Sequence, residues 1–299
     1  ITFTLPDTLW PLFWLNRSLL NDIGKIAADI IQSVAKKKSL KVGIFLAIHT
    51  FGRNLKRNVH IHLSVTLGGI TADHSQWKSL YFHQQSLMKQ WRYHIIAWLR
   101  RAAKNDSFSL PQSLQPQPGQ PNRFAILLDK LSTAYWHVHC QKPCKNHHQN
   151  VKYIGRYLRR PPIAQSKLMH YNGQDIAFRY LDHYSNSYRT FRCSAQEFIA
   201  RFVSHIPDKF FRMVRYYGFL SHALRGKLLP IVNQLLGQKQ PPTPTTTWPE
   251  QMVLDFGINP LECILCQSPM RLTLIHFGKS AAEIQQCHQQ LALRQKIFH

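Results

Sequence analysis

The chain has 299 residues, of which 44% are hydrophobic, and it carries 38 Lys plus Arg against 14 Asp plus Glu, a formal net charge of +24. A core of useful size is therefore possible, and the charge favours a polyanionic partner, above all nucleic acid, with a ribosome-type or membrane-surface binder as the alternative. No apolar run reaches the roughly 18 residues that a membrane span needs, and no secretory leader is recognisable. Because the six cysteines include a Cys-x-x-Cys pair rather than a disulfide framework, we expect a cytoplasmic protein without a membrane partner. The first residue is Ile1 rather than Met, so we expect the natural N-terminus to lie upstream.

The first third of the chain predicts helices followed by a hairpin. Apolar residues at mixed three- and four-residue spacing predict a helical segment over residues 1–39. Residues 40–51 predict a buried strand, and residues 58–67 predict a second one. The short connection between them is basic, and its cations are candidate DNA contacts: Arg53, Lys56 and Arg57.

The second strand alternates between apolar and polar residues, which is typical of a half-buried strand. Its polar face carries His60 and His62, whose side chains point the same way about 6.6 Å apart along the strand. Two imidazoles in this arrangement can bind one metal ion. A lone His-x-His pair is nevertheless more often just two polar residues on the solvent-facing side of a sheet. If the turn centres near Asn54, His49 lies opposite His60 as a third ligand, with Asp73 or a polar residue near a later helix as alternatives.

The middle of the chain predicts a long helix over residues 75–104, a low-complexity loop over 106–122 and a short strand within 123–140. That strand holds a second His-x-His, His137 and His139, which competes with the first pair by spacing alone. We rank it lower because no long alternating strand follows it.

Residues 150–160 predict a basic helix that Pro161 and Pro162 end. Tyr153 and Tyr157 stand four residues apart, so they share one helix face. Such a pair is usually packing, but here it stands beside three cations: Arg156, Arg159 and Arg160.

The last third predicts a hairpin over residues 175–193, a helix that a capping box at Ser194–Glu197 opens, and an amphipathic helix towards residue 236. A Pro- and Thr-rich linker follows at 238–249. The tail holds a possible structural zinc site with an atypical adjacent Cys-His pair: Cys263, Cys266, Cys287 and His288.

A His-x-His strand, a tyrosine pair and a basic chain together suit the cutting and rejoining of DNA. A tyrosine hydroxyl, whose pKa is ordinarily near 10, would attack a phosphodiester and retain the bond energy as a phosphotyrosine. A divalent ion on the histidines would polarise the phosphate.

These motifs resemble those of a known family. His60-Ile-His62 is similar to the histidine motif of HUH endonucleases, and Tyr153-x-x-x-Tyr157 to the tyrosine pair of rolling-circle transposases. The chain resembles the IS-ninety-one family of insertion-sequence transposases over roughly residues 1–236. Three segments carry this resemblance: "HTFGRNLKRNVHIHLSVTLGG", "NVKYIGRYLRRPPIA" and "FVSHIPDKFFRMVRYYGFLS". That family usually begins with a cysteine-rich zinc segment, and the sequence from Ile1 onward does not start with one.

The resemblance implies an α+β fold, an HUH-endonuclease-like antiparallel sheet flanked by helices, with a helical N-terminal segment and a C-terminal extension. We expect four segments: 1–39 helical, 40–165 catalytic core, 166–236 the rest of the transposase domain, and 237–299 a linker and cysteine tail. The resemblance also implies that His60 and His62 bind Mg²⁺ or Mn²⁺ and that Tyr153 and Tyr157 are the nucleophiles. The implied DNA partners are the single-stranded ends of the element and the target. The implied setting is the bacterial cytoplasm, in association with the nucleoid.

Five other functions compete with this interpretation. A replication initiator or a conjugative relaxase would share the metal and tyrosine chemistry. A non-catalytic binder of single strands, such as an inactive remnant, would use the same residues structurally. A transposase with three carboxylates fits poorly with 14 acidic residues, and a hydrolytic zinc enzyme would normally carry an acidic residue just after the histidine pair, where Leu63 stands.

Overall fold

The computed structural model describes residues 1–141, 161–182, 185–238, 246–263 and 265–270, together with residues 283 and 286. The chain divides into two compact units, residues 1–240 and residues 241–299. The finer boundaries expected from the sequence stay predictions. Among the described helices, none has the length and apolar character that crossing a bilayer requires.

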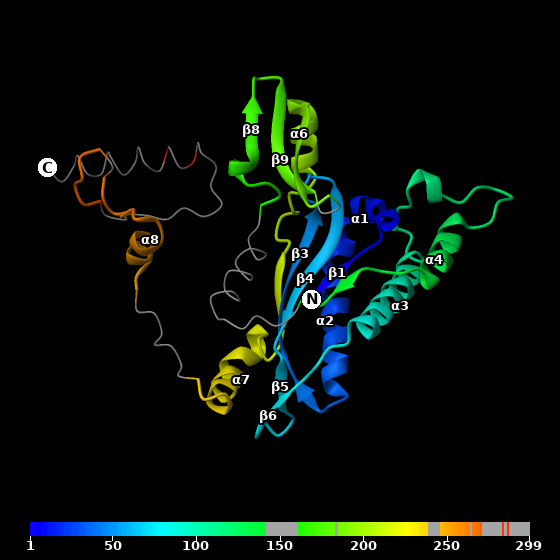
Figure 1. Cartoon of the computed structure of the whole chain (residues 1–299), viewed down its shortest axis with the longest axis horizontal. Helices are drawn as coiled ribbons and strands as arrows, with labels where there is room; N and C mark the ends of the chain where they lie inside the picture. Colours follow the sequence, from blue (N-terminus) through cyan, green and yellow to red (C-terminus); the bar gives the residue numbers. More distant parts are fainter. Residues whose placement is uncertain are drawn as a thin grey trace. The chain divides into compact units, whose positions relative to one another are not determined.

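The first unit is built on a five-stranded sheet in the order β11-β3-β4-β1-β7, in which every neighbouring pair is antiparallel (Figure 1). Strands β3 and β4 form the predicted hairpin, and strands distant in the sequence pair on either side of it. The five strands are β1 (Thr2–Thr4), β3 (Gly43–Phe51), β4 (Arg57–Val65), β7 (Val138–His139) and β11 (Val214–Gly218).

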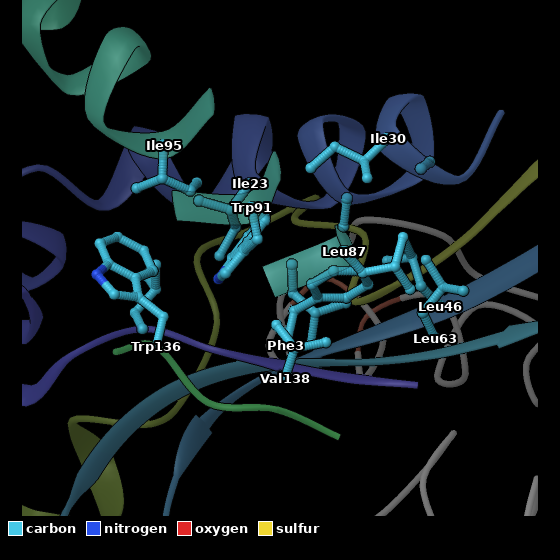
Figure 2. Close-up of a cluster of buried hydrophobic side chains, with 14 of the residues drawn as sticks. Phe3, Ile23, Ile30, Leu46, Leu63, Leu87, Trp91, Ile95, Trp136 and Val138 are labelled. Carbon is cyan, nitrogen blue, oxygen red and sulfur yellow. The ribbon is translucent and has the colours of Figure 1, made fainter. Parts of the chain in front are cut away.

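Helices cover one face of this sheet, as the α+β prediction expected. They are α1 (Trp10–Leu15), α2 (Leu20–Lys36), α3 (Gln84–Ala102) and α4 (Arg123–Thr133). Figure 2 shows Ile23, Leu87 and Trp91 of the helices meeting Phe3 and Leu46 of the sheet, and all five are buried. A Cβ at Gly24 would lie 3.2 Å from Ile48, so this glycine lets α2 approach β3 closely.

A small sheet and a helix extend the first unit beyond the hairpin. The sheet has the order β2-β5-β6, from β2 (Leu40–Lys41), β5 (Gly68–Thr71) and β6 (Trp77–Ser79). A second core joins it to helix α7 (His222–Leu235), where Ile70, Phe219 and Leu228 are buried together. Short 3-10 turns lie at Asp7–Leu9, Arg17–Leu19, Gln112–Leu114 and Gln165–Lys167.

The third sheet holds the hairpin predicted at residues 175–193. Its order is β10-β9-β8, from β8 (Leu168–Tyr171), β9 (Asp175–Asp182) and β10 (Ser187–Ser194), and helix α6 (Ala195–Val203) follows. The Ser194 hydroxyl accepts the Glu197 N–H at 3.1 Å, so the predicted helix start is confirmed. In the second unit, α8 (Trp248–Phe256) begins with a complete capping box and ends at Gly257.

Three expectations about secondary structure were wrong. Residues 2–4 form strand β1 rather than helix, because β4 and β7 pair with them on both sides and Phe3 packs against Trp91 with 5.1 Å between ring centroids. The helix expected over 75–104 begins only at Gln84, since Trp77 pairs in β6 and packs on Phe219. Strand β11 was missed because its pairing with β3 joins residues far apart in the chain.

Candidate metal centre

The β3–β4 hairpin has the register that the sequence predicted. His49 lies opposite His60, and Ala47 lies opposite His62. The turn between the strands is closed by two backbone bonds, from Gly52 N–H to Lys56 C=O at 2.8 Å and from Leu55 N–H to Gly52 C=O at 3.1 Å. Because side chains alternate along a strand, the apolar residues of β4 enter the core and its histidines face away from the helices.

Three imidazoles therefore converge on one face of the sheet. The ring nitrogens of His49, His60 and His62 that can serve as ligands all lie within 4.8 Å of one another. The Nε2 atoms of His60 and His62 are 3.1 Å apart. His49 is buried, with 3% of its surface exposed, whereas the other two rings are half-buried. The hairpin thus presents a compact nitrogen cluster.

Hydrogen bonds fix the orientation of two of these rings. Nδ1 of His60 lies 2.9 Å from the Asn58 carbonyl oxygen, which can only accept, so Nδ1 donates and Nε2 of the neutral ring carries the lone pair. Nδ1 of His62 lies 3.3 Å from the Thr2 hydroxyl. Partners on the second ring nitrogen are typical of metal-binding histidines, because they set the tautomer that leaves the first nitrogen able to coordinate.

The spacing fits a divalent ion. Two imidazole nitrogens bound at about 2.1 Å stand roughly 3.0–3.4 Å apart at ligand angles between octahedral and tetrahedral, and the observed 3.1 Å lies in this range. The side-chain oxygen of Asn58 is buried without a hydrogen-bond partner among the described residues. The face of β4 that carries His60 and His62 therefore also carries an oxygen with a lone pair to offer. Imidazole suits first-row transition ions better than Mg²⁺, which prefers oxygen ligands.

The cluster lies in a cleft of about 450 Å³ that three parts of the chain enclose. The hairpin supplies the histidines and Arg53, β1 supplies Thr2 and Thr4, and the third sheet supplies the end of β9. The lining is completed by Phe51, Gly52, Asn54, Asn58, Pro162, Tyr180, Leu181 and Asp182. This volume suits a phosphate group with part of a nucleotide, since small-ligand sites begin at about 300 Å³.

The predicted DNA-contacting cations of the hairpin have different positions. Arg53 lines the cleft, and Lys56 is exposed at the turn. Arg57 is on the opposite face of β4 from the histidines, with its guanidinium 4.6 Å from the centre of the Trp14 ring. Only Arg53 of the three is therefore placed to contact a phosphate in the cleft.

Sequence reasoning missed the contribution of β9. Tyr180 and Asp182 line the histidine cleft, and the Asp182 carboxylate lies 3.0 Å from Arg189 Nε and accepts the Ser185 hydroxyl at 3.1 Å. The alternation of β9 shows that Tyr180 and Asp182 share a face. No local pattern indicates that this face meets a hairpin more than a hundred residues earlier in the chain, so the sequence carried no signal for it.

A buried histidine supports the turn end of the hairpin. Nε2 of His205 donates to the Leu55 carbonyl at 3.1 Å, and its Nδ1 accepts the Thr50 hydroxyl at 3.2 Å. The ring also meets Phe51 and Trp14 edge-on. Burial lowers the pKa of His205, so the neutral form that makes both hydrogen bonds is favoured.

The alternatives to the first histidine pair lie elsewhere. His137 and His139 are exposed on or beside the edge strand β7 and do not join the nitrogen cluster. Asp73 lies in the turn between β5 and β6, where hydrogen bonds, the Ser75 hydroxyl first, lower its pKa to about 2. The tyrosine pair and the cations of the predicted basic helix lie outside the described residues: Tyr153, Tyr157, Arg156, Arg159 and Arg160.

The second unit places Cys263 and Cys266 in one tight turn. The Cys263 N–H donates to the Ser268 carbonyl at 2.9 Å, and the Gln267 N–H donates to the Cys263 carbonyl at 2.8 Å. The Ser268 hydroxyl lies 3.3 Å from the Cys266 sulfur, and this bond is the largest cause that lowers the pKa of Cys266 to about 7. The other two predicted zinc ligands, Cys287 and His288, lie outside the described residues, so the zinc site stays a prediction.

Known proteins provide a comparison for this arrangement. The family model Y2_Tnp, described as "Putative transposase", matches residues 43–227, which include the hairpin, β9 and β11. The chain is 40% identical over 283 residues to the transposase for insertion sequence element IS801 of Pseudomonas savastanoi pv. phaseolicola, covering 91% of this chain and 66% of that protein. It is 26% identical over 260 residues to "Putative transposase y4qJ" of Sinorhizobium fredii (strain NBRC 101917 / NGR234), covering 84% of this chain and 65% of that protein.

The chain thus spans about two thirds of the length of each of these relatives. No solved structure matches it, so the likeness to HUH endonucleases rests on the sequence motifs. The resemblance to IS-ninety-one-like insertion-sequence transposases is confirmed by the family model and by the relative at 40% identity. From these matches the chain belongs to the Y2_Tnp family of transposases.

Proposed function

We propose that this protein is a rolling-circle transposase that nicks single-stranded DNA in a metal-dependent step and transfers the strand through a 5′-phosphotyrosine. The observation that carries the proposal is the cleft in which His49, His60 and His62 bring their ring nitrogens within 4.8 Å of one another. A non-catalytic binder would have no need for such a cluster, in which hydrogen bonds orient two of the rings.

Chain connectivity supports Tyr153 and Tyr157 as nucleophiles. Pro162 lines the histidine cleft, and Tyr157 precedes it by five residues. An extended chain advances at most about 3.6 Å per residue, so the chain between Tyr157 and Pro162 can span at most roughly 18 Å, and that between Tyr153 and Pro162 at most roughly 32 Å. Both tyrosines are therefore tethered to the site, whatever path the intervening residues take.

In the proposed reaction the three histidines would hold a divalent ion, and Arg53 would contact the phosphate. The ion would supply Lewis-acid polarisation of the phosphate oxygens. The tyrosine oxygen forms a bond to phosphorus and gives up its proton to solvent, while the 3′ oxygen leaves and takes up a proton. Attack of a 3′ hydroxyl on the adduct reverses these changes, so resealing needs no ATP. Two tyrosines allow one to hold the first 5′ end while the other makes a second cut.

A replication initiator or relaxase would use the same chemistry, and the family match favours the transposase. Metal dependence is tested by nicking of single-stranded DNA from the ends of the source element in EDTA, Mg²⁺ or Mn²⁺. Changing His60 and His62 together to Ala should abolish nicking. The matched change at His137 and His139 should leave a substantial fraction, because those rings lie outside the cluster. The opposite result would mean that the wrong histidine pair is assigned.

The nucleophile is tested by replacing tyrosine with phenylalanine, which keeps the ring and removes the hydroxyl. Tyr153→Phe with Tyr157→Phe should abolish the adduct that survives a denaturing gel, and each single change should leave some adduct but block completed transfer. Tyr180→Phe is the matched control, because Tyr180 lines the same cleft. If Tyr180→Phe alone removes the adduct while the double variant keeps it, the nucleophile comes from β9.

A further inference from the structure

The sheet of β8, β9 and β10 has two different faces. On one face Phe178 of β9 packs against Phe191 of β10 and Phe198 of α6, with ring centroids 5.4 and 5.8 Å apart. Phe178 is fully buried. Because side chains alternate along a strand, the neighbours of Phe178 and Phe191 point to the other face. Helix α6 contacts β9 and β10, and its Phe198 packs on the Phe178 face.

The outer face combines an aromatic ring with cations. Tyr188 of β10 is 51% exposed, and its ring centre lies 4.2 Å from the guanidinium carbon of Arg179 and 4.9 Å from Nζ of Lys167. Arg192 is exposed two residues beyond Thr190 on the same side of β10. The Thr190 hydroxyl lies 3.8 Å from the Met169 sulfur, which brings a 59% exposed methionine to the same face.

No carboxylate of the described residues neutralises the positive charge of this face. Among the described residues, no carboxylate comes within 4.0 Å of a charged nitrogen of Lys167, Arg179 or Arg192. The carboxylates of the three strands are at the two ends of β9: Asp175 begins the strand, and Asp182 is paired with Arg189. Two cations beside the exposed Tyr188 ring, and Arg192 further along β10, are therefore available to an outside anion.

This face is continuous with the metal cleft. Leu181 lies two residues beyond Arg179 on the outer face of β9, and it lines the histidine cleft together with Tyr180 and Asp182, which point to the opposite face. At about 3.3 Å per residue, the strand carries the chain from Arg179 to Asp182 over roughly 10 Å. A polymer lying on the outer face therefore meets the wall of the metal cleft at Leu181.

We propose that the outer face of the β8–β9–β10 sheet, defined by Lys167, Arg179, Tyr188 and Arg192, is a platform for single-stranded DNA that leads the strand into the metal cleft. The cations contact phosphates, and Tyr188 stacks on a base held beside them. Aromatic rings next to cations bind single strands in this way because every base has a π face, whereas the bases of an intact duplex are stacked on one another. That the bound polymer is single-stranded DNA rests on the proposed function. The position of the platform rests only on the exposed residues of the outer face.

The test measures binding without metal, which separates it from the nicking assay. A fluorescein-labelled 20-nucleotide oligothymidylate is titrated with the full chain in EDTA, and anisotropy is recorded between 50 and 400 mM NaCl. The platform variant changes Lys167, Arg179 and Arg192 to Gln. The matched control changes the exposed cations Lys36, Lys37 and Lys38 to Gln, which removes the same charge from the end of α2.

The platform variant should lower the slope of log affinity against log salt by about 2, since each lost phosphate contact on a single strand contributes about 0.7. At 0.1 M salt this corresponds to roughly a hundred-fold loss, and the control should lose much less. Tyr188→Ala should weaken binding by about five-fold or more, and Tyr188→Phe should bind normally because stacking needs the ring and not the hydroxyl.

Equal losses in the platform and control variants would overturn the proposal, as would tighter binding of a 20-base-pair duplex with the same dependence on these residues. The two hypotheses can fail separately. Metal-dependent nicking with no platform effect refutes this inference alone. A platform effect without nicking refutes the transposase chemistry and leaves the binding surface in place. Thermal melts followed by circular dichroism establish that each variant is folded.

Discussion

Metal binding to the histidine cluster should stabilise the first unit by a measurable amount. An ion that binds the native state at 100 times its Kd adds about 2.7 kcal/mol to the free energy of unfolding. For a unit of this size, residues 1–240, each kcal/mol raises Tm by about 2–4 °C. Mn²⁺ at saturation should therefore raise Tm by about 5–10 °C in a melt followed by circular dichroism, compared with the same protein in EDTA.

The contribution of each histidine can be separated in the same melt. His49 is 3% exposed, so His49→Gln is preferable to a change that leaves a cavity. His49→Gln leaves two ligand nitrogens, and the double change of His60 and His62 to Ala leaves one. Each variant should therefore bind Mn²⁺ more weakly than the three-histidine cluster, and its Mn²⁺-dependent rise in Tm should fall to about 2 °C or less. The double change of His137 and His139 to Ala should keep the full shift. A full shift in the His60 and His62 variant would refute the assignment of the cluster as the metal centre.

Two further predictions concern stability. Burial lowers the pKa of His205, so the unfolded chain takes up this proton first as the pH falls. The free energy of unfolding from urea melts should therefore decrease below about pH 6.5 by up to about 1.4 kcal/mol per pH unit, and His205→Gln should flatten that decrease. Gly218 has a φ of 62°, and a Cβ there would collide with the Val42 carbonyl, so Gly218→Ala should cost at least about 2 kcal/mol. Gly226→Ala, where a Cβ in α7 would meet nothing within 4 Å, should instead gain about 0.5–1 kcal/mol; equal effects would contradict the argument.

The histidine hairpin could be predicted because its information is local. Alternation along residues 58–66 assigned the faces, and a turn near Asn54 fixed the register that places His49 opposite His60. The surroundings of the hairpin could not be predicted in the same way. A three-residue strand such as β1 has no periodic signal of its own, and the strands beside it decide its conformation. The positions of Tyr180 and Asp182 depend on tertiary packing between segments far apart in the chain.

The order of strands also determines how long one edge of the site is exposed during synthesis. Strand β3 pairs with β4 as soon as Val65 has emerged, but its other partner, β11, begins only at Val214. At about 5–20 residues per second, the stretch from Phe51 to Val214 takes roughly 8–30 s to synthesise. Throughout that time the outer N–H and C=O groups of β3 have no strand beside them, and such an edge can pair with another chain. Until β11 has been synthesised, the nascent hairpin therefore presents an open strand edge to other chains.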